Sequence, residues 1–313
     1  MSDRCDKDPL DYLDEAKTPQ LLSKFITGFE CQGSQDGRYC NCKSCRLLVL
    51  FEGIDGYVAL LGKLNDYAGD PIELYVFPDD RAWADKIFHK ITFSTGLIDA
   101  FLGLKSLPQQ NLLGFELPQN DIFDNIVAIA ASAWTIGHEC SHIFYHQNDD
   151  FSDTLSNHAL EADADRLAAS FVYRVLQWLQ TPTDDDENIR CLALYCIFSY
   201  LRSVEYSDGS ANHPSTAMRL WLISSKLATL NKDPSEPSDN NFETLESKSA
   251  SRRLVECLFR CEIEYQQLNP DDLTNLLTEL NEIIKDMTFI PISERWDEMQ
   301  DEIRERVRKD VTK

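Results

Sequence analysis

The spacing of hydrophobic residues predicts a chain that is mainly helical. Apolar side chains recur every three or four residues between Asp8 and Phe29, and again through most of the second half of the chain. That spacing places apolar side chains on one face of a helix, where they can be buried together. The later helices are expected at Glu161 to Leu179, Asn188 to Val204 and Pro214 to Leu230, and the stretch from Phe242 to Lys313 is expected to be wholly helical.

A few short segments have the pattern of strands instead. Leu47 to Phe51 and Glu73 to Phe77 are short apolar runs, whereas apolar and polar residues alternate from Phe88 to Thr95. Gly96 is expected to end this third strand, before a short helix from Leu97 to Leu104. The third strand is either an exposed edge that could pair with an extended substrate or an internal strand. The predicted fold class is therefore α+β, mainly helical, with a small β-sheet.

A long helix, predicted from residue 120 or 121 to residue 148, carries the most informative motif. It contains His138-Glu139-x-x-His142, the HExxH signature of zinc hydrolases. Residues four apart share one face of a helix, so the two histidines can hold one metal ion. Glu139 lies about 100° further round, where it can touch a water molecule at the metal. His146 lies about 12 Å along the helix from His138, too far to share its metal.

The next predicted helix, which Ser156 or Asn157 could cap, carries a pair of carboxylates. Glu161 and Asp165 are four residues apart and share one face, whereas Asp163 points to the opposite side and is expected to be solvated. Two like charges at this spacing repel by roughly 0.2–0.5 kcal/mol on a solvated helix. The repulsion disappears if one carboxylate binds a cation and the other accepts a hydrogen bond from a ligand histidine.

This combination of motifs resembles the gluzincin metallopeptidases. In that family HExxH is followed by Glu-x-x-Ala-Asp, and the glutamate completes a zinc site whose implied ligands here are His138, His142 and Glu161. The segment from His213-Pro214 to Arg219 is similar to a His-Pro-x-x-x-x-Arg segment of integral-membrane and cytosolic gluzincins. The overall likeness is strongest to the Lit-type phage-exclusion peptidases of bacteria, and it covers residues 126–223.

The resemblance implies a zincin-like metallopeptidase domain with zinc as its cofactor. Glu139 is then the general base, and Asp165 accepts a hydrogen bond from a ligand histidine. His213 is implied to stabilise the oxyanion, with a helix-cap or core role as the alternative. Arg219 is implied either to orient the substrate or to anchor its own helix.

The activity implied by the resemblance is hydrolysis of a peptide bond in a specific cytosolic protein, as part of phage defence. The implied substrate is the translation elongation factor that delivers aminoacyl-tRNA, and a trigger protein or peptide would activate the enzyme. One alternative is a regulatory protease that cuts repressors of mobile elements. Another is a non-catalytic, zinc-stabilised interaction protein that binds through its acidic helical tail. Glu139 counts against the latter, because a purely structural zinc site has no use for a general base.

Cysteines near the N-terminus form a separate cluster. Four of them are separated by gaps of eight, one and two residues, at Cys31, Cys40, Cys42 and Cys45. Four thiolates could hold a structural zinc, although only the last pair has the usual gap of two to four residues. The alternatives are a loop of free thiols or a redox-labile cluster. The cysteines in the later helices, and Cys140, are expected to be buried thiols.

A segment rich in Pro, Ser, Asp and Asn predicts the domain organisation. Residues 232–241 have the composition of a linker. We expect a zincin-like catalytic domain at residues 1–231, including an N-terminal helical segment with the cysteine cluster. A C-terminal helical region is expected at residues 242–313.

Composition and charge restrict the partners and the location. The net charge of -23 argues against nucleic acid, whose phosphates require a basic surface. Met1 to Lys17 is polar and acidic, without the apolar core of a signal peptide. The longest apolar run, Ile126 to Ile136, is shorter than the roughly 20 residues that span a bilayer. We therefore expect a cytoplasmic protein that binds neither membrane nor nucleic acid, with its ten cysteines reduced.

Overall fold

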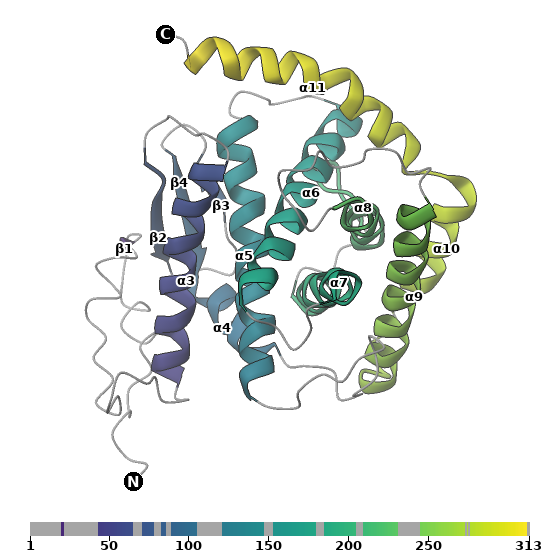
Figure 1. Ribbon diagram of the computed structural model, residues 1–313, viewed down its shortest axis with the longest axis horizontal. Coiled ribbons are helices and arrows are strands. Elements are labelled where there is room, and N and C mark those ends of the chain that lie inside the picture. The colour runs from purple at the N-terminus through teal and green to yellow at the C-terminus, as the bar shows by residue number, and fades with distance from the viewer. Residues whose placement is uncertain are drawn as a thin grey trace.

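The fold is mainly helical with one small sheet, as the fold class predicted. It was obtained as a computed structural model, which describes residues 20–21, 43–64, 71–77, 83–85, 89–104, 121–146, 153–179, 185–204, 209–230, 245–272, 274 and 276–311. Two long helices, α5 (Asp121–Tyr145) and α6 (Thr154–Trp178), lie side by side at the centre (Figure 1). The α5 helix begins at Asp121, one of the two expected starts, and ends at Tyr145, before Asn148. Both helices contribute to one continuous hydrophobic core.

The sheet lies at one side of the molecule, next to α5 (Figure 1). Its strands among the described residues follow the order β1-β2-β4-β3, with bounds β1 Gln20–Leu21, β2 Glu73–Phe77, β3 Trp83–Asp85 and β4 Lys90–Ser94. The helical prediction for Asp8 to Phe29 is wrong at β1, and the rest of that segment lies outside the described residues. The expected second and third strands are thus confirmed as β2 and β4, which run parallel. Because β4 also pairs with β3, it is internal, and the exposed-edge alternative is wrong.

The segment Leu47–Phe51, predicted as a strand, is instead part of a helix, α3 (Lys43–Leu64). The buried side chains of Leu50, Ile54 and Leu61 fall on one face of this helix, and α3 packs against α5. Periodicity cannot distinguish a short apolar run in a buried helix from a strand, which explains the wrong prediction.

The turn from β4 into helix α4 (Thr95–Gly103) is made by a side-chain cap. The hydroxyl of Ser94 accepts a hydrogen bond from the backbone N–H of Leu97 at 2.9 Å. Such a cap satisfies a donor that the first helical turn leaves without a partner. Gly96 therefore lies inside the helix, and the prediction that it ends the strand is wrong.

Helix α6 begins earlier than the sequence suggested. Its N-cap is Asp153, whose carboxylate accepts a hydrogen bond from the backbone N–H of Ser156 at 2.8 Å. The predicted caps, Ser156 and Asn157, both lie within the first turn. The negative charge of this cap also interacts favourably with the positive end of the helix dipole.

The remaining helices build outward from α6. Helices α7 (Asp186–Ser203) and α8 (Thr216–Ala228) pack beside α6, and α9 (Leu245–Leu268) and α10 (Leu276–Asp286) lie beyond them (Figure 1). Helix α11 (Ile290–Val311) crosses over α6. None of the described helices is long and apolar enough to cross a membrane.

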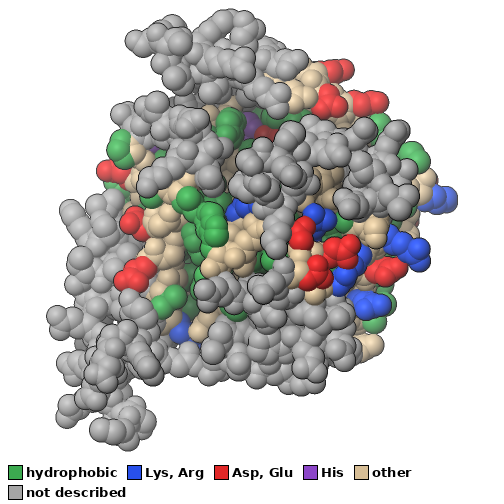
Figure 2. All heavy atoms as spheres, viewed as in Figure 1, with side chains coloured by type: hydrophobic (Ala, Val, Ile, Leu, Met, Phe, Trp, Pro, Cys, Tyr) green, Lys and Arg blue, Asp and Glu red, His purple; other side chains and the backbone are tan. Residues whose placement is uncertain are grey.

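The C-terminal helices share buried contacts with the rest of the chain. Arg202 of α7 donates hydrogen bonds to both carboxylate oxygens of Glu262 in α9, at 2.9 and 3.1 Å, and both side chains are buried. Outside this pair, acidic and basic side chains are mixed on the α9 side of the surface (Figure 2). The predicted linker at residues 232–241 lies outside the described residues, so the division into two regions stays a prediction.

Close contact between α5 and α6 depends on Gly137, which directly precedes the first motif histidine. A Cβ atom at this position would lie 2.9 Å from the Cα of Ala168 and 3.3 Å from its Cβ. Because backbone atoms cannot move aside as a side chain can, the glycine allows the two helices to approach closely. The histidines of α5 are thereby brought within reach of the carboxylates of α6.

The Gly137→Ala variant is expected to lose about 1–3 kcal/mol of unfolding free energy, because the added methyl group overpacks the α5–α6 contact. Urea unfolding of the full-length protein measures this loss. Gly56→Ala is the matched control, since a Cβ on this glycine of α3 would have nothing within 4 Å. The control is expected to be neutral or stabilising, as alanine favours a helix. Equal stability of Gly137→Ala and the wild type would contradict the role given to Gly137.

Candidate metal centre and active site

Helix α5 and the residue directly after it place three histidines on one side. His138, His142 and His146 follow one another at intervals of four residues, and they are 6%, 8% and 0% exposed. The ring of Trp134, one turn before His138, packs against that histidine with ring centroids 5.3 Å apart. The histidines are therefore held in fixed orientations by a buried helix.

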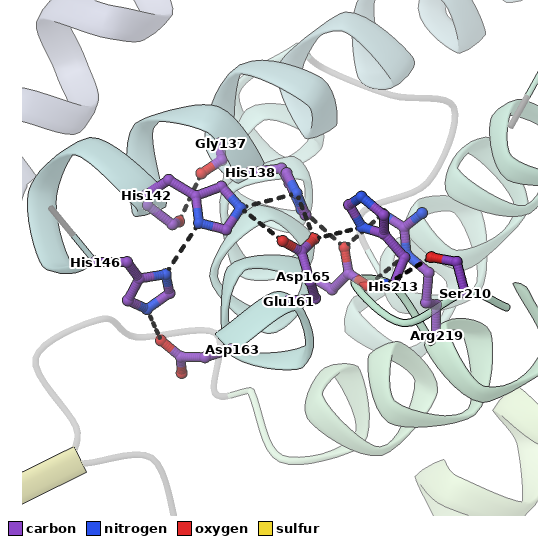
Figure 3. A network of polar contacts seen from close by, with 11 residues as sticks. Gly137, His138, His142, His146, Glu161, Asp163, Asp165, Ser210, His213 and Arg219 are labelled. Carbon is purple, nitrogen blue, oxygen red and sulfur yellow. Dashed lines mark hydrogen bonds and ion pairs between the residues drawn. The ribbon is translucent and has the colours of Figure 1, made fainter. Parts of the chain in front are cut away.

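Helix α6 directs Glu161 at the first two of these histidines. The Nε2 atom of His138 lies 3.2 Å from Oε2 of Glu161, and Nε2 of His142 lies 3.4 Å from Oε1. The two Nε2 atoms are themselves 3.2 Å apart (Figure 3). Two imidazole nitrogens and one carboxylate thus converge on a single point, and this group could hold a metal ion.

The donor set fits a tetrahedral metal such as zinc. With metal–ligand bonds of about 2.0–2.1 Å, neighbouring ligand atoms of a tetrahedron lie about 3.3 Å apart, close to the distances found here. Burial lowers the pKa of His138, but its hydrogen bonds with Asp165 and Glu161 outweigh this effect and raise that pKa to about 10. Burial likewise raises the pKa of Glu161, yet hydrogen bonds with His138 and His213 hold it well below its usual value. The site therefore favours a cation.

A buried carboxylate contacts the second ring nitrogen of His138. Oδ1 of Asp165 lies 2.9 Å from Nδ1 of His138, on the side of the ring away from Glu161. Asp165 is fully buried, and the guanidinium of Arg219 in α8 donates to both its oxygens, at 2.8 and 2.9 Å. Burial alone would raise the pKa of Asp165, but the contacts with Arg219 and His138 have the larger effect. They lower this pKa below its usual value, so the carboxylate stays charged. These contacts fit the anchoring alternative for Arg219.

The third histidine and Asp163 form a second contact that the sequence reasoning missed. Nδ1 of His146 lies 3.1 Å from Nδ1 of His142, and its Nε2 lies 3.3 Å from Oδ2 of Asp163. Asp163 was expected to be solvated, which is wrong, because its side chain is only 14% exposed. The helical phase placed it away from Glu161 correctly but could not reveal what covers that side. The available signal was the position of His146, one further turn along the motif helix.

The loop before α8 brings His213 to the ligand group. Its Nδ1 lies 3.0 Å from Oε2 of Glu161, and its side chain is 52% exposed (Figure 3). Ser210 closes the loop, because its backbone N–H donates to the carbonyl of His213 at 2.8 Å and its hydroxyl accepts from the N–H of His213 at 3.1 Å. The carbonyl of Ser210 is 2.7 Å from Nε2 of His158 in α6. The cap of α8 is Ser215, so His213 is neither a helix cap nor a core residue.

Glu139 and Cys140 are two of the three residues between the motif histidines. Glu139 is partly exposed, whereas Cys140 is fully buried. Burial, together with the neighbouring charge of Glu139, raises the pKa of the Cys140 thiol, which keeps it protonated. The buried state predicted for the cysteines of the helical half is confirmed, for Cys140, Cys191, Cys196, Cys257 and Cys261.

The N-terminal cysteine cluster lies outside the described residues. This holds for Cys31, Cys40 and Cys42, and for the side chain of Cys45, whose backbone belongs to α3. The structural zinc considered for these four residues stays a prediction.

Comparison with known proteins agrees with the chemistry of the site. Neither the curated proteins nor the solved structures include a match to this chain. A family model, Peptidase U49, matches residues 105–236. This stretch holds α5 to α8 and with them the convergent histidines, Glu161 and His213. The part of the chain that carries the candidate metal centre is therefore similar to a family of peptidases.

Proposed function

We propose that this protein is a zinc-dependent endopeptidase. The observation that carries the proposal is the convergence of His138, His142 and Glu161 at distances of 3.2–3.4 Å, the geometry of a tetrahedral site. Three protein ligands leave one position open for water or substrate, which is typical of catalytic zinc. The similarity to Peptidase U49 supports peptide hydrolysis as the reaction.

The residues around the ligands have distinct roles in the proposed reaction. Zinc in this site would polarise the scissile carbonyl and lower the pKa of a water molecule. Glu139, partly exposed beside the first ligand, takes the proton of the attacking water and returns it to the leaving amine. His213, half exposed and held by Glu161, donates a hydrogen bond to the carbonyl oxygen as negative charge develops there.

The proposed substrate is one specific protein of the cell rather than polypeptides in general. An endopeptidase with an unrestricted site inside a cell would damage its host, so the activity requires restraint. Restraint can come from a cleft that accepts one exposed loop, or from a site completed only by a trigger protein or peptide. The resemblance to phage-exclusion peptidases suggests phage defence and a translation elongation factor as the substrate.

The test compares wild type with Glu139→Gln, both expressed in bacterial cells with and without phage infection. New peptide termini across the proteome are expected from one or very few proteins, and only with the wild type. Purified wild-type protein is expected to leave casein almost uncut. The identity of the cleaved protein separates phage defence from the alternative of a repressor-cleaving protease.

Metal analysis and circular dichroism of Glu139→Gln serve as the control, because this variant should keep its fold and its zinc while losing the general base. Identical peptide termini with both proteins under every condition would contradict the proposal and favour the non-catalytic interaction protein. Rapid, unselective digestion of casein by the wild type would contradict the restricted substrate.

A further inference from the structure

We propose that His146 and Asp163 are positioning residues that fix the tautomer and orientation of His142 for metal binding. This inference rests on the metal site of the proposed function and deepens it. His146 lies one helical turn after His142, and its two ring nitrogens face His142 and Asp163 (Figure 3). The His146–Asp163 pair thus joins α5 to α6 beside the metal ligands.

The contacts of each ring nitrogen indicate which nitrogen of His142 and of His146 carries the proton. His142 presents Nε2 to Glu161 and to His138, so this atom must carry a lone pair to bind metal. A neutral imidazole then has its proton on Nδ1, and that N–H points at Nδ1 of His146, 3.1 Å away. His146 accepts there and therefore has its own proton on Nε2, facing Oδ2 of Asp163.

The opposite tautomer of His146 would be unfavourable. Two N–H groups would then face each other across 3.1 Å, and the carboxylate of Asp163 would face a lone pair at 3.3 Å. Asp163 accepts only, because an ionised carboxylate has no proton to give. Its negative charge therefore selects the tautomer of His146, and His146 selects the tautomer that lets His142 bind a metal.

Because His146 is buried, its two ring nitrogens depend on these two contacts for hydrogen-bond partners. Its side chain has no exposed surface, and the Trp296 ring in α11 packs against it in a T-shaped arrangement, with ring centroids 6.0 Å apart. A buried polar atom without a partner costs free energy, so the ring cannot exchange these contacts for water. Asp163 lies two residues, about 200° of helix rotation, from Glu161 and from Asp165, which is why its carboxylate reaches His146 rather than the metal ligands.

The two ligand histidines are thereby supported in parallel ways. His138 donates directly to a carboxylate of α6, Asp165, at 2.9 Å. His142 reaches a carboxylate of the same helix, Asp163, through the ring of His146. Loss of such a supporting partner typically weakens metal affinity by about 10–100-fold.

The experiment measures the affinity of the full-length protein for Zn²⁺ by competition with a chelator. His146→Phe, which keeps a planar ring without polar atoms, and Asp163→Ala are each expected to weaken Zn²⁺ binding by about 10–100-fold. Asp163→Asn keeps an acceptor oxygen, so it should recover most of the affinity lost in Asp163→Ala. The visible spectrum of the Co²⁺-loaded protein should change in the same two weakened variants.

Trp296→Leu is the matched control, because it removes packing from His146 but leaves both of its polar contacts. It should lower thermal stability while leaving Zn²⁺ affinity within about threefold of the wild type. If His146→Phe does not fold, the two Asp163 variants decide, since that side chain lies nearer the surface. Tight Zn²⁺ binding by the wild type together with unchanged affinity in Asp163→Ala would overturn the inference alone. A wild type that binds no Zn²⁺ would overturn the proposed function and the inference with it.

Discussion

Replacing Glu161 with alanine is expected to remove tightly bound zinc from the protein. The carboxylate lies 3.2 Å and 3.4 Å from the Nε2 atoms of His138 and His142, so its loss leaves two ligands where three converged. With zinc binding free energies of about 10–16 kcal/mol shared among the ligands, losing one should weaken affinity by a hundredfold or more. Metal analysis after dialysis against a weak chelator measures the effect, and His138→Ala and His142→Ala should behave alike.

The matched control is Glu139→Gln, which changes a carboxylate in the same motif without removing a ligand. It should keep one zinc per chain, since the general base is expected to meet only the water molecule. Zinc at the wild-type level in Glu161→Ala would contradict the three-ligand site, and the metal would then have to be held elsewhere. Two zinc ions per wild-type chain would instead indicate that the cysteine cluster also binds metal.

The pairing of the two motif histidines could be predicted from the sequence because it depends on local helix geometry. Residues four apart on a helix share a face, so the pairing of His138 with His142 follows once α5 is recognised. The apolar residues before the motif gave the bounds of α5, and polar residues marked where it begins. The choice of Glu161 as the partner came from the resemblance to gluzincins, whose spacing between the two helices this chain shares.

Features that depend on tertiary packing could not be predicted in the same way. The run Leu47–Phe51 forms a helix because α5 buries one side of it, and nothing local distinguishes that from a strand. Asp163 has the helical phase of a solvated residue, but α5 and α11 cover that side. A sequence indicates which way a side chain points on its helix, whereas only the fold shows which other helix lies there.

Replacing Arg219 with leucine is expected to destabilise the protein by about 3–5 kcal/mol, because it leaves the fully buried Asp165 without its main counter-charge. The guanidinium binds both oxygens of Asp165, and its central carbon lies 5.0 Å from the centroid of the Trp134 ring, so charge, hydrogen bonds and packing are lost together. Urea unfolding measures the loss. Since Asp165 also supports His138, Zn²⁺ affinity should fall in the same variant.

The matched control is Arg252→Leu in α9. It removes an exposed arginine whose Nε lies 3.2 Å from Oε1 of Glu256. Exposed ion pairs contribute little to stability, so this variant should unfold close to the wild type. Asp165→Asn combined with Arg219→Leu should recover part of the lost stability, because no buried charge then remains without a partner. If Arg219→Leu unfolded like the wild type but lost peptidase activity, Arg219 would be a residue that orients the substrate, the alternative to an anchor of α8.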